Sequence, residues 1–289
     1  MKITSRNVNG IRAAVKKWFI EFLRSDNPDI ICLQETKAFV EQMPPELSDY
    51  LTAEWYDYCR HAGTRAGYAG TAIFWRTSVI WDVVSCNIFA DNQMFYEDGR
   101  VTEINFTIHP EKPSFEDKGD TASAEGVLES QHYTLLNWYF PNGGTRADWT
   151  EMLSYKLKFY DCLIEYIQYK RASGRKVIVV WDYNIVHTEI DIARPKENQN
   201  TIGFLPVERE KVSQYLSSAD MIDVFRHLHP DKLDEYTWWS MRAGARPRNI
   251  WRRIDYVTVS PDLIDQVTEF AHRQDVHGSD HCPVTVTIE

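Results

Sequence analysis

The apolar residues of this chain gather in short runs that predict β-strands, and segments with helical spacing lie between them. Two of the runs, 101–108 and 282–288, alternate with polar residues, so these strands are expected to be buried on one face. The run 177–180 contains only β-branched residues, which is typical of a strand buried on both faces. In total, eight strands are expected, over residues 2–8, 29–35, 71–75, 101–108, 133–140, 176–182, 253–260 and 282–288.

One helix is predicted clearly over residues 146–172, where apolar residues recur at three- and four-residue spacings and Gly174 follows the end. No Gly/Ser/Pro-rich linker separates the alternating strands and helices. We therefore expect an α/β protein with two sheets packed face to face and helices outside. The segment 109–131 is polar and acidic, and its closely flanking strands predict a surface loop within one domain spanning residues 1–289.

The composition is that of a folded protein, because 43% of its 289 residues are hydrophobic and it holds 10 Trp, 15 Tyr and 13 Phe. The first residues show no apolar export signal, and no run approaches the roughly 18 apolar residues of a membrane span. We expect a soluble, cytoplasmic protein without a membrane partner. The five cysteines are odd in number and form no CxxC motif, which favours buried, reduced thiols.

The net charge of −10 argues at first against a nucleic-acid partner. However, residues 91–130 hold ten acidic and three basic side chains, so this segment contributes −7 and the rest of the chain only −3. Residues 237–256 hold five arginines against one aspartate, interleaved with aromatic residues. This composition suits contact with a phosphate backbone and stacking on bases, although a solvated arginine-rich loop is the alternative.

Carboxylate and amide residues follow several of the apolar runs. Each one alone is typical of a turn or a helix cap. Taken together, these oxygen donors without a Cys/His set favour Mg²⁺ or Mn²⁺ over zinc. No P-loop, GxSxG or HExxH motif is present, which disfavours nucleotide hydrolysis, serine hydrolysis and zinc proteolysis. The residues concerned are Asn7, Asn9, Glu35, Asp182, Asn184, Asp255 and Asp280, and His281 stands next to the last of them.

Eight segments resemble, in family order, the exodeoxyribonuclease III / AP endonuclease family within the endonuclease–exonuclease–phosphatase superfamily. They are NVNGIRA, LQETK, YFPNG, DYNIVHTEIDIARPK, GFLPVERE, YTWWSMRAGARPRN, RIDYVTVS and GSDHCPV. The resemblance implies a four-layer, DNase I-like α/β sandwich with one active site at the strand ends. Because matching residues lie near both termini, both ends of the chain are expected to meet in one domain.

The resemblance also implies a metal site that holds Mg²⁺, or alternatively Mn²⁺. Glu35 in LQETK matches the family's metal ligand, with support from Asn7 and, around a second position, from Asp280. Asn142, in YFPNG, is expected near the phosphate, and a turn residue is its alternative.

The resemblance also implies catalytic roles for other residues of this chain. Asp182 matches the aspartate that orients or deprotonates the attacking water, and Asn184 the amide that holds this water or a phosphate oxygen. His281 matches the histidine that binds the phosphate, and Asp255 the carboxylate that fixes its tautomer. Tyr139 matches a tyrosine near the leaving oxygen, although a core tyrosine is the alternative reading.

The chain departs from the family at Trp181, where glycine is usual, and Trp251 stands near another usual glycine. In the family, the backbone of the first glycine lies near the extruded sugar. An added indole in a fitted pocket costs about 1–3 kcal/mol. We therefore predict that Trp181 narrows the pocket and weakens abasic-site incision. The alternative is that Trp181 turns outward or stacks on Trp251. The residues expected to contact DNA are Asn142, Trp181, Arg246, Arg248, Trp251 and Trp239.

The resemblance implies a Mg²⁺-dependent DNA-repair phosphodiesterase that removes 3′-terminal nucleotides and 3′-blocking groups and incises 5′ to abasic sites. The expected partner is double-stranded DNA with 3′ ends, nicks or abasic sites, and the expected state is a monomer. One alternative is a phosphoesterase acting on inositol phosphates or sphingomyelin, against which the arginine–aromatic segment argues. The other is a non-catalytic DNA-binding or scaffold protein, against which the full set of polar site residues argues.

Overall fold

The computed structural model of the chain describes residues 1–109, 130–143, 149–241 and 244–289. The acidic loop expected at 109–131 lies almost entirely outside the described residues. The described strands form two six-stranded sheets. The first contains, from edge to edge, β11 (Val267–His272), β12 (Val284–Ile288), β1 (Lys2–Asn7), β2 (Ile30–Gln34), β4 (Thr71–Arg76) and β3 (Tyr56–His61). The second contains β5 (Asp82–Asn87), β6 (Val101–Ile108), β7 (Gln131–Tyr139), β8 (Lys176–Asp182), β10 (Asp255–Val259) and β9 (Ile222–Asp223).

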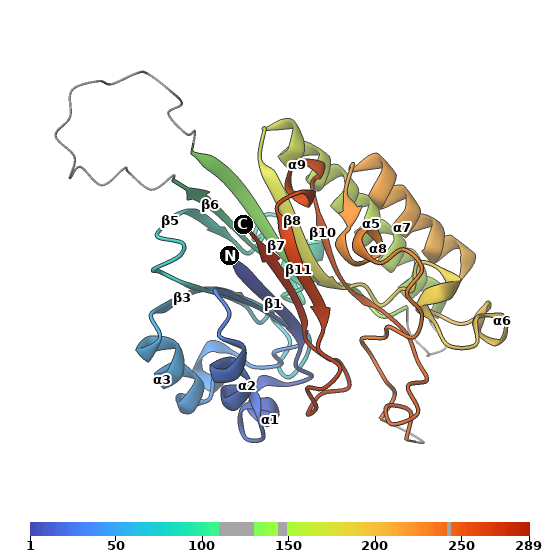
Figure 1. Cartoon of the computed structure of the whole chain (residues 1–289), viewed down its shortest axis with the longest axis horizontal. Coiled ribbons are helices and arrows are strands. Elements are labelled where there is room, and N and C mark those ends of the chain that lie inside the picture. Colours follow the sequence, from blue (N-terminus) through green and yellow to red (C-terminus); the bar gives the residue numbers. More distant parts are fainter. Residues whose placement is uncertain (110–129, 144–148, 242–243) are drawn as a thin grey trace.

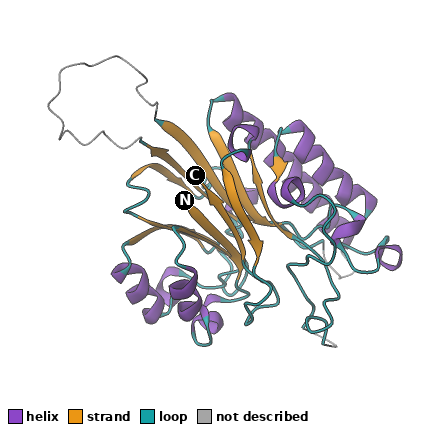
Figure 2. Cartoon of the chain, in the orientation of Figure 1, coloured by secondary structure: helices purple, strands orange, loops and turns teal. Residues whose placement is uncertain are grey.

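The sheets pack face to face, and helices cover both outer faces, as Figures 1 and 2 show. The three largest apolar cores follow these layers: one lies between the sheets, and the other two lie between each sheet and its helices. This arrangement confirms the four-layer α/β sandwich. The helices against the first sheet are α1 (Ile11–Val15), α2 (Phe19–Asp26) and α3 (Pro45–Ala53), and those against the second are α5 (Trp149–Ala172) and α7 (Pro206–Ser218). Four short helices are α4 (Gln93–Tyr96), α6 (Pro195–Asn198), α8 (Val224–Leu228) and α9 (Pro261–Ile264).

No helix in the described part of the chain is both long and apolar enough to span a membrane. The two chain ends lie side by side in the first sheet, because β1 pairs antiparallel with β12 (Figure 1). The N-terminal amino group of Met1 donates a hydrogen bond of 2.6 Å to the carbonyl of Ile288. This pairing brings polar residues near residue 7 and residue 281 to one end of the sandwich.

The polar face of β6 is buried, contrary to the expectation of a half-buried strand. Helix α5 lies over this face. Lys170 places its Nζ 2.8 Å from Oε1 of Glu103, and the Tyr166 hydroxyl donates to Oε2 of Glu103 at 2.7 Å. Because the buried carboxylate has these partners, the alternation of polar residues here marks a polar layer inside the protein.

Cys59 on β3 and Cys86 on β5 form a disulfide, so the expectation of reduced thiols is wrong for this pair. β3 and β5 are edge strands of different sheets. The fold places them next to each other, with a Cα–Cα distance of 5.9 Å between the two cysteines. Cys32 and Cys282 are free and buried, as expected, and Cys162 is free and half-buried.

Replacing both Cys59 and Cys86 by alanine is expected to lower the free energy of unfolding by about 3–4 kcal/mol. The bond closes a loop between residues 27 positions apart, and its loss restores conformational entropy to the unfolded chain. Urea unfolding measures the change, with Cys162→Ala as the matched control. Equal stability of the double variant and the wild type under oxidising conditions would contradict the expectation.

Candidate active site

Polar residues from both sheets meet at one end of the sandwich. Asn7 ends β1 and Glu35 directly follows β2, a strand parallel to β1. Asp182 ends β8, and Asp255 stands opposite it in the antiparallel pairing of β10 with β8. His281 lies just before β12. Neighbouring strands that run in these directions bring these positions to the same edge of each sheet.

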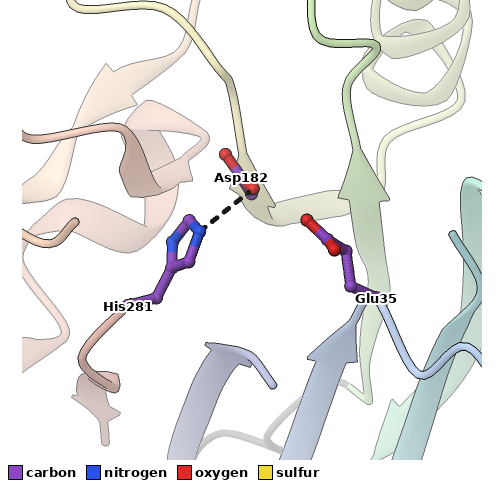
Figure 3. Close-up of side chains that lie close together, drawn as sticks. All are labelled: Glu35, Asp182 and His281. Atoms are coloured by element: carbon purple, nitrogen blue, oxygen red, sulfur yellow. Dashed lines mark ion pairs between the residues drawn. The ribbon is translucent and has the colours of Figure 1, made fainter. Parts of the chain in front are cut away.

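Glu35, Asp182 and His281 point toward one another (Figure 3). Each presents one possible ligand atom, and these atoms all lie within 4.8 Å of one another. The carboxylates of Glu35 and Asp182 face a common point beside the imidazole, and carboxylate oxygens are preferred by Mg²⁺ and Mn²⁺. The donor set is therefore compatible with the ion expected from the sequence.

Asn7 connects the carboxylates of the two sheets. Its Nδ2 donates to Oε1 of Glu35 at 2.8 Å and to Oδ2 of Asp182 at 2.9 Å. Its Oδ1 accepts a hydrogen bond of 2.9 Å from the backbone N–H of Asn9. The amide oxygen thus faces the backbone rather than the carboxylates. In this structure the Asn7 side chain holds the carboxylates of Glu35 and Asp182 in position through its amide N–H groups.

Four residues around the site have a left-handed backbone that non-glycine residues rarely adopt. The φ values are 45° for Asn9, 52° for Glu35, 51° for Lys37 and 52° for Asn184. Such a conformation costs about 1–2 kcal/mol for residues such as Glu35 and Lys37, and less for asparagine. Strain of this kind persists where the surrounding structure enforces it, often at functional sites. Here it turns each segment sharply as it leaves the end of its strand.

His281 lies between two carboxylates. Its Nδ1 is 2.9 Å from Oδ2 of Asp255, and its Nε2 is 3.8 Å from Oδ2 of Asp182. Burial opposes the charged imidazole, but Asp255 and Asp182 raise the pKa of His281 to about 10. The Asp255 contact holds a proton on Nδ1 and leaves Nε2 directed toward Asp182.

Burial raises the pKa of Asp182 to about 7, and Asp255 and Glu35 add to this while His281 opposes it. The carboxylate is also held in place, because its Oδ1 accepts a hydrogen bond of 3.0 Å from the backbone N–H of Asn184. A fixed carboxyl group with a pKa near neutrality is suited to accept a proton from water.

Glu35 and Tyr139 interact at the rim of this cluster. Burial acts to raise the pKa of Glu35, but Lys37, with its Nζ 2.6 Å from Oε2, and Asn7 hold it below its usual value. Burial and Glu35 raise the pKa of Tyr139 well above its usual value, so its hydroxyl stays protonated. The guanidinium of Arg100 lies 5.0 Å from the Tyr139 ring centroid. Tyr139 is therefore a hydrogen-bond donor at the cluster.

The other expected site residues lie around this centre. Asn184 donates from Nδ2 to the carbonyl of Phe140 at 3.0 Å, and Asn142 is exposed in the loop after β7. Asp280 lies outside the group of three possible ligands. Its Oδ2 accepts from the indole N–H of Trp238 at 3.0 Å, and its Oδ1 accepts from the side chain of Asn9 at 3.1 Å. Both carboxylate oxygens of Asp280 thus accept hydrogen bonds from neutral donors.

The prediction that Trp181 narrows the pocket is wrong in this structure. Its side chain is 0% exposed and packs in the core between the second sheet and its helices. The ring centroid lies 3.8 Å from that of Tyr183 and 4.6 Å from that of Tyr215 on α7. Because side chains alternate along a strand, Trp181 faces the opposite side of the sheet from Asp182. It does not stack on Trp251, which pairs with Trp238.

Two of the residues expected to contact DNA instead stabilise the loop that carries them. Trp239 is 2% exposed and donates from Nε1 to Oδ1 of Asn249 at 3.1 Å. Arg246 lies over the Trp239 ring at 4.6 Å and donates three hydrogen bonds to backbone carbonyls. In contrast, Arg248 is exposed and Trp251 is half-buried, so their side chains reach the surface.

A buried ionic network holds the loop after β8 in place. Arg253 donates to Asp191 at 2.8 Å and to Asp223 at 2.7 Å, and all three residues are buried. His187 contacts the Ser213 hydroxyl at 2.9 Å. These contacts show that His187 and Asp191 hold the loop after β8 against neighbouring elements.

Sequence reasoning did not single out three residues that contact the cluster. Lys37 pairs with Glu35, and Trp238 donates to Asp280. Lys156 of α5 donates to the backbone carbonyl of Asn184 at 2.9 Å. Lys37 could have been found from its place in the LQETK segment. Nothing in the local pattern around Lys156 indicates its inward direction.

Comparisons with known proteins agree with this geometry. A family model described as the endonuclease/exonuclease/phosphatase family matches residues 7–281. An exodeoxyribonuclease of Bacillus subtilis (strain 168) is 35% identical over 100% of this chain and 99% of its own length. A DNA-(apurinic or apyrimidinic site) endonuclease of Dictyostelium discoideum is 32% identical over 100% of this chain and 71% of its own length.

Among solved structures, the catalytic domain of Xenopus laevis APE2 superimposes with a TM-score of 0.79 at 28% sequence identity, covering 100% of this chain and 91% of that one. An AP endonuclease from Leishmania major gives the same TM-score of 0.79 at 26% identity, covering 99% of this chain and 86% of that one. The chain therefore belongs to the endonuclease/exonuclease/phosphatase family and, within it, to the exodeoxyribonuclease III and AP endonuclease type of DNA-repair nuclease.

Proposed function

We propose that this chain is a Mg²⁺-dependent phosphodiesterase that removes nucleotides and blocking groups from the 3′ ends of duplex DNA and incises the strand 5′ to abasic sites. The observation that carries the proposal is the group of Asn7, Glu35, Asp182 and His281, which joins both sheets through direct side-chain contacts. The printed names of the relatives, an exodeoxyribonuclease and an AP endonuclease, support DNA ends and abasic sites as substrates.

In this proposal, Glu35 is the main residue that holds the ion, with its carboxylate positioned by Asn7 and Lys37. When bound, Mg²⁺ supplies positive charge that stabilises negative charge on the phosphate oxygens. The low pKa of Glu35 keeps it in the ionised form that binds a cation.

Asp182 accepts the proton of the attacking water. Its two oxygens are held by Asn7 and by the backbone of Asn184, so the base is oriented before substrate binds. The side chain of Asn184 lies beside it and holds the water or a phosphate oxygen. An oriented general base contributes about 10²–10⁴-fold to such a reaction.

His281 and Tyr139 donate hydrogen bonds to the phosphate and to the oxygen that leaves. Asp255 holds the His281 imidazole through Nδ1, so Nε2 is the nitrogen that can reach the substrate. Neutral and cationic donors stabilise the extra negative charge that develops on the phosphate in the transition state.

Rates on three duplexes test the proposal: one with a recessed 3′-hydroxyl end, one with a 3′-phosphate and one with an internal abasic site. We expect hydrolysis of all three with Mg²⁺ and none with EDTA. Hydrolysis of a soluble inositol phosphate together with intact DNA in all three assays would overturn it and favour a phosphoesterase of another substrate class.

A further inference from the structure

Arg252 lies next to the catalytic cluster but has no part in the chemistry proposed above. Its backbone forms a bridge to Trp238, which forms a second bridge to His281. Its guanidinium lies 5.7 Å from the Trp238 ring centroid and 5.8 Å from that of Trp251. One amino group, Nη1, donates to the carbonyl of Ile202 at 3.3 Å. The cation is therefore held at the border of the site by two aromatic rings.

The charge of Arg252 has no carboxylate partner within the part of the chain that the structure describes. Its Nε is buried there without a hydrogen-bond acceptor. Burial lowers the pKa of Arg252 against the influence of Glu208. That glutamate is already paired with Lys156 at 2.8 Å. A partly buried cation without a counter-charge is unfavourable unless an anion binds beside it.

Arg252 is one of the residues that line a cavity of about 190 Å³. Arg252, Arg194, Trp251 and Asn198 line it, together with Glu197 and three apolar residues. Glu197 places a carboxylate oxygen 3.5 Å from Nη1 of Arg194, with both side chains largely exposed. Glu197 therefore offsets part of the charge of Arg194, whereas Arg252 has no such carboxylate partner among the described residues.

We propose that Arg252, assisted by Arg194, binds a phosphate of the DNA strand next to the one that is hydrolysed. This proposal rests on the proposed function, since it assigns a second phosphate subsite to the same substrate. Guanidinium groups bind phosphate through paired N–H donors, and Trp251 offers an aromatic face to the adjoining sugar or base. The subsite holds the strand in register while the cluster acts on the neighbouring linkage.

Steady-state kinetics of Arg252→Met test the subsite, because methionine keeps an apolar stem but no charge. We expect KM for the 3′-phosphate duplex to rise about 10- to 100-fold, as expected for loss of a charge-assisted hydrogen bond, with kcat changed less than threefold. The slope of log KM against log salt concentration is expected to decrease by the amount that corresponds to about one phosphate contact. Arg24→Met, at an exposed position on α2, is the control and should leave KM unchanged.

A second measurement uses duplexes in which single phosphates near the 3′ end are replaced by uncharged methylphosphonates. One such replacement should raise KM of the wild type about 10-fold and leave KM of Arg252→Met unchanged. A wild type that tolerates every replacement overturns the subsite even if the variant does not fold. Wild-type hydrolysis of unmodified duplex is read separately, so failure of the proposed function is distinguishable from failure of the subsite.

Discussion

Replacing Asp182 by asparagine is expected to lower kcat on a 3′-phosphate duplex by about 10²–10⁴-fold, the contribution typical of a general base. Asparagine has nearly the same shape but cannot accept the proton of the attacking water. Asp182 is 1% exposed, and its oxygens accept hydrogen bonds from Asn7 and Asn184, so another group cannot easily take its place.

The new amide of Asp182→Asn also brings an N–H toward one of these two donors, which adds a modest loss of stability. For this reason kcat is measured well below the unfolding temperature of the variant. Asp231→Asn, in an exposed turn, is the matched control and should retain the wild-type rate. A rate for Asp182→Asn within tenfold of the wild type would assign the base to another residue.

Replacing Lys156 by methionine is expected to lower the free energy of unfolding by about 3–5 kcal/mol. Lys156 and Glu208 form an ion pair of 2.8 Å in which both side chains are 0% exposed. Glu208 also accepts hydrogen bonds from the backbone N–H groups of Gly203 and Leu205. Removal of the lysine leaves the buried carboxylate of Glu208 without its counter-charge, and this unpaired charge causes most of the loss of stability.

Lys158→Met, at an exposed position on the same helix, is the matched control and should change stability by less than about 0.5 kcal/mol. Adding Glu208→Gln to Lys156→Met removes the unpaired charge and is expected to recover part of the loss. Urea unfolding of the four proteins measures these differences. A Lys156→Met variant as stable as the wild type would mean that the pair contributes no net stability.

The interior strands could be predicted from the sequence, but the edges of the sheets could not. All eight expected strands are present, and the strands that were missed, β3, β5, β9 and β11, are the outermost strands of the two sheets. An edge strand packs less of its surface, so its sequence can be polar: β5 reads DVVSCN, and three of its six residues are exposed while none is fully buried. The disulfide was not predicted for the same reason, because it joins two of these unpredicted edge strands.

The residues of the candidate site could be predicted from the sequence, but the directions in which neighbouring side chains point could not. Asn7, Glu35, Asp182, Asp255 and His281 were expected together and lie together. The error at Trp181 came from its position in the chain beside Asp182. Successive side chains of a strand point to opposite faces, so a catalytic Asp182 places Trp181 on the helix side.

Side-chain contacts between residues that lie far apart in the chain could not be predicted from the sequence. Lys156 lies on a helix with a polar and an apolar face, where a lysine is normally expected in solvent. Its burial depends on Glu208, a residue 52 positions later in the chain. Likewise, Arg246 and Arg253 belong to a segment whose composition suits phosphate binding, yet backbone carbonyls and two aspartates bind them inside the fold.

The role of Glu35 in holding the ion is tested most directly by the Mg²⁺ dependence of hydrolysis of a duplex with a 3′-phosphate. This dependence is compared between the wild type and Glu35→Gln. If Glu35 holds the ion at the junction of the two sheets, the wild type is inactive in EDTA and saturates with Mg²⁺. Glu35→Gln then requires at least about tenfold more Mg²⁺ for half-maximal rate, the smallest change typical of a damaged metal site. A rate that persists in EDTA, or an identical Mg²⁺ requirement in both proteins, would contradict the assignment.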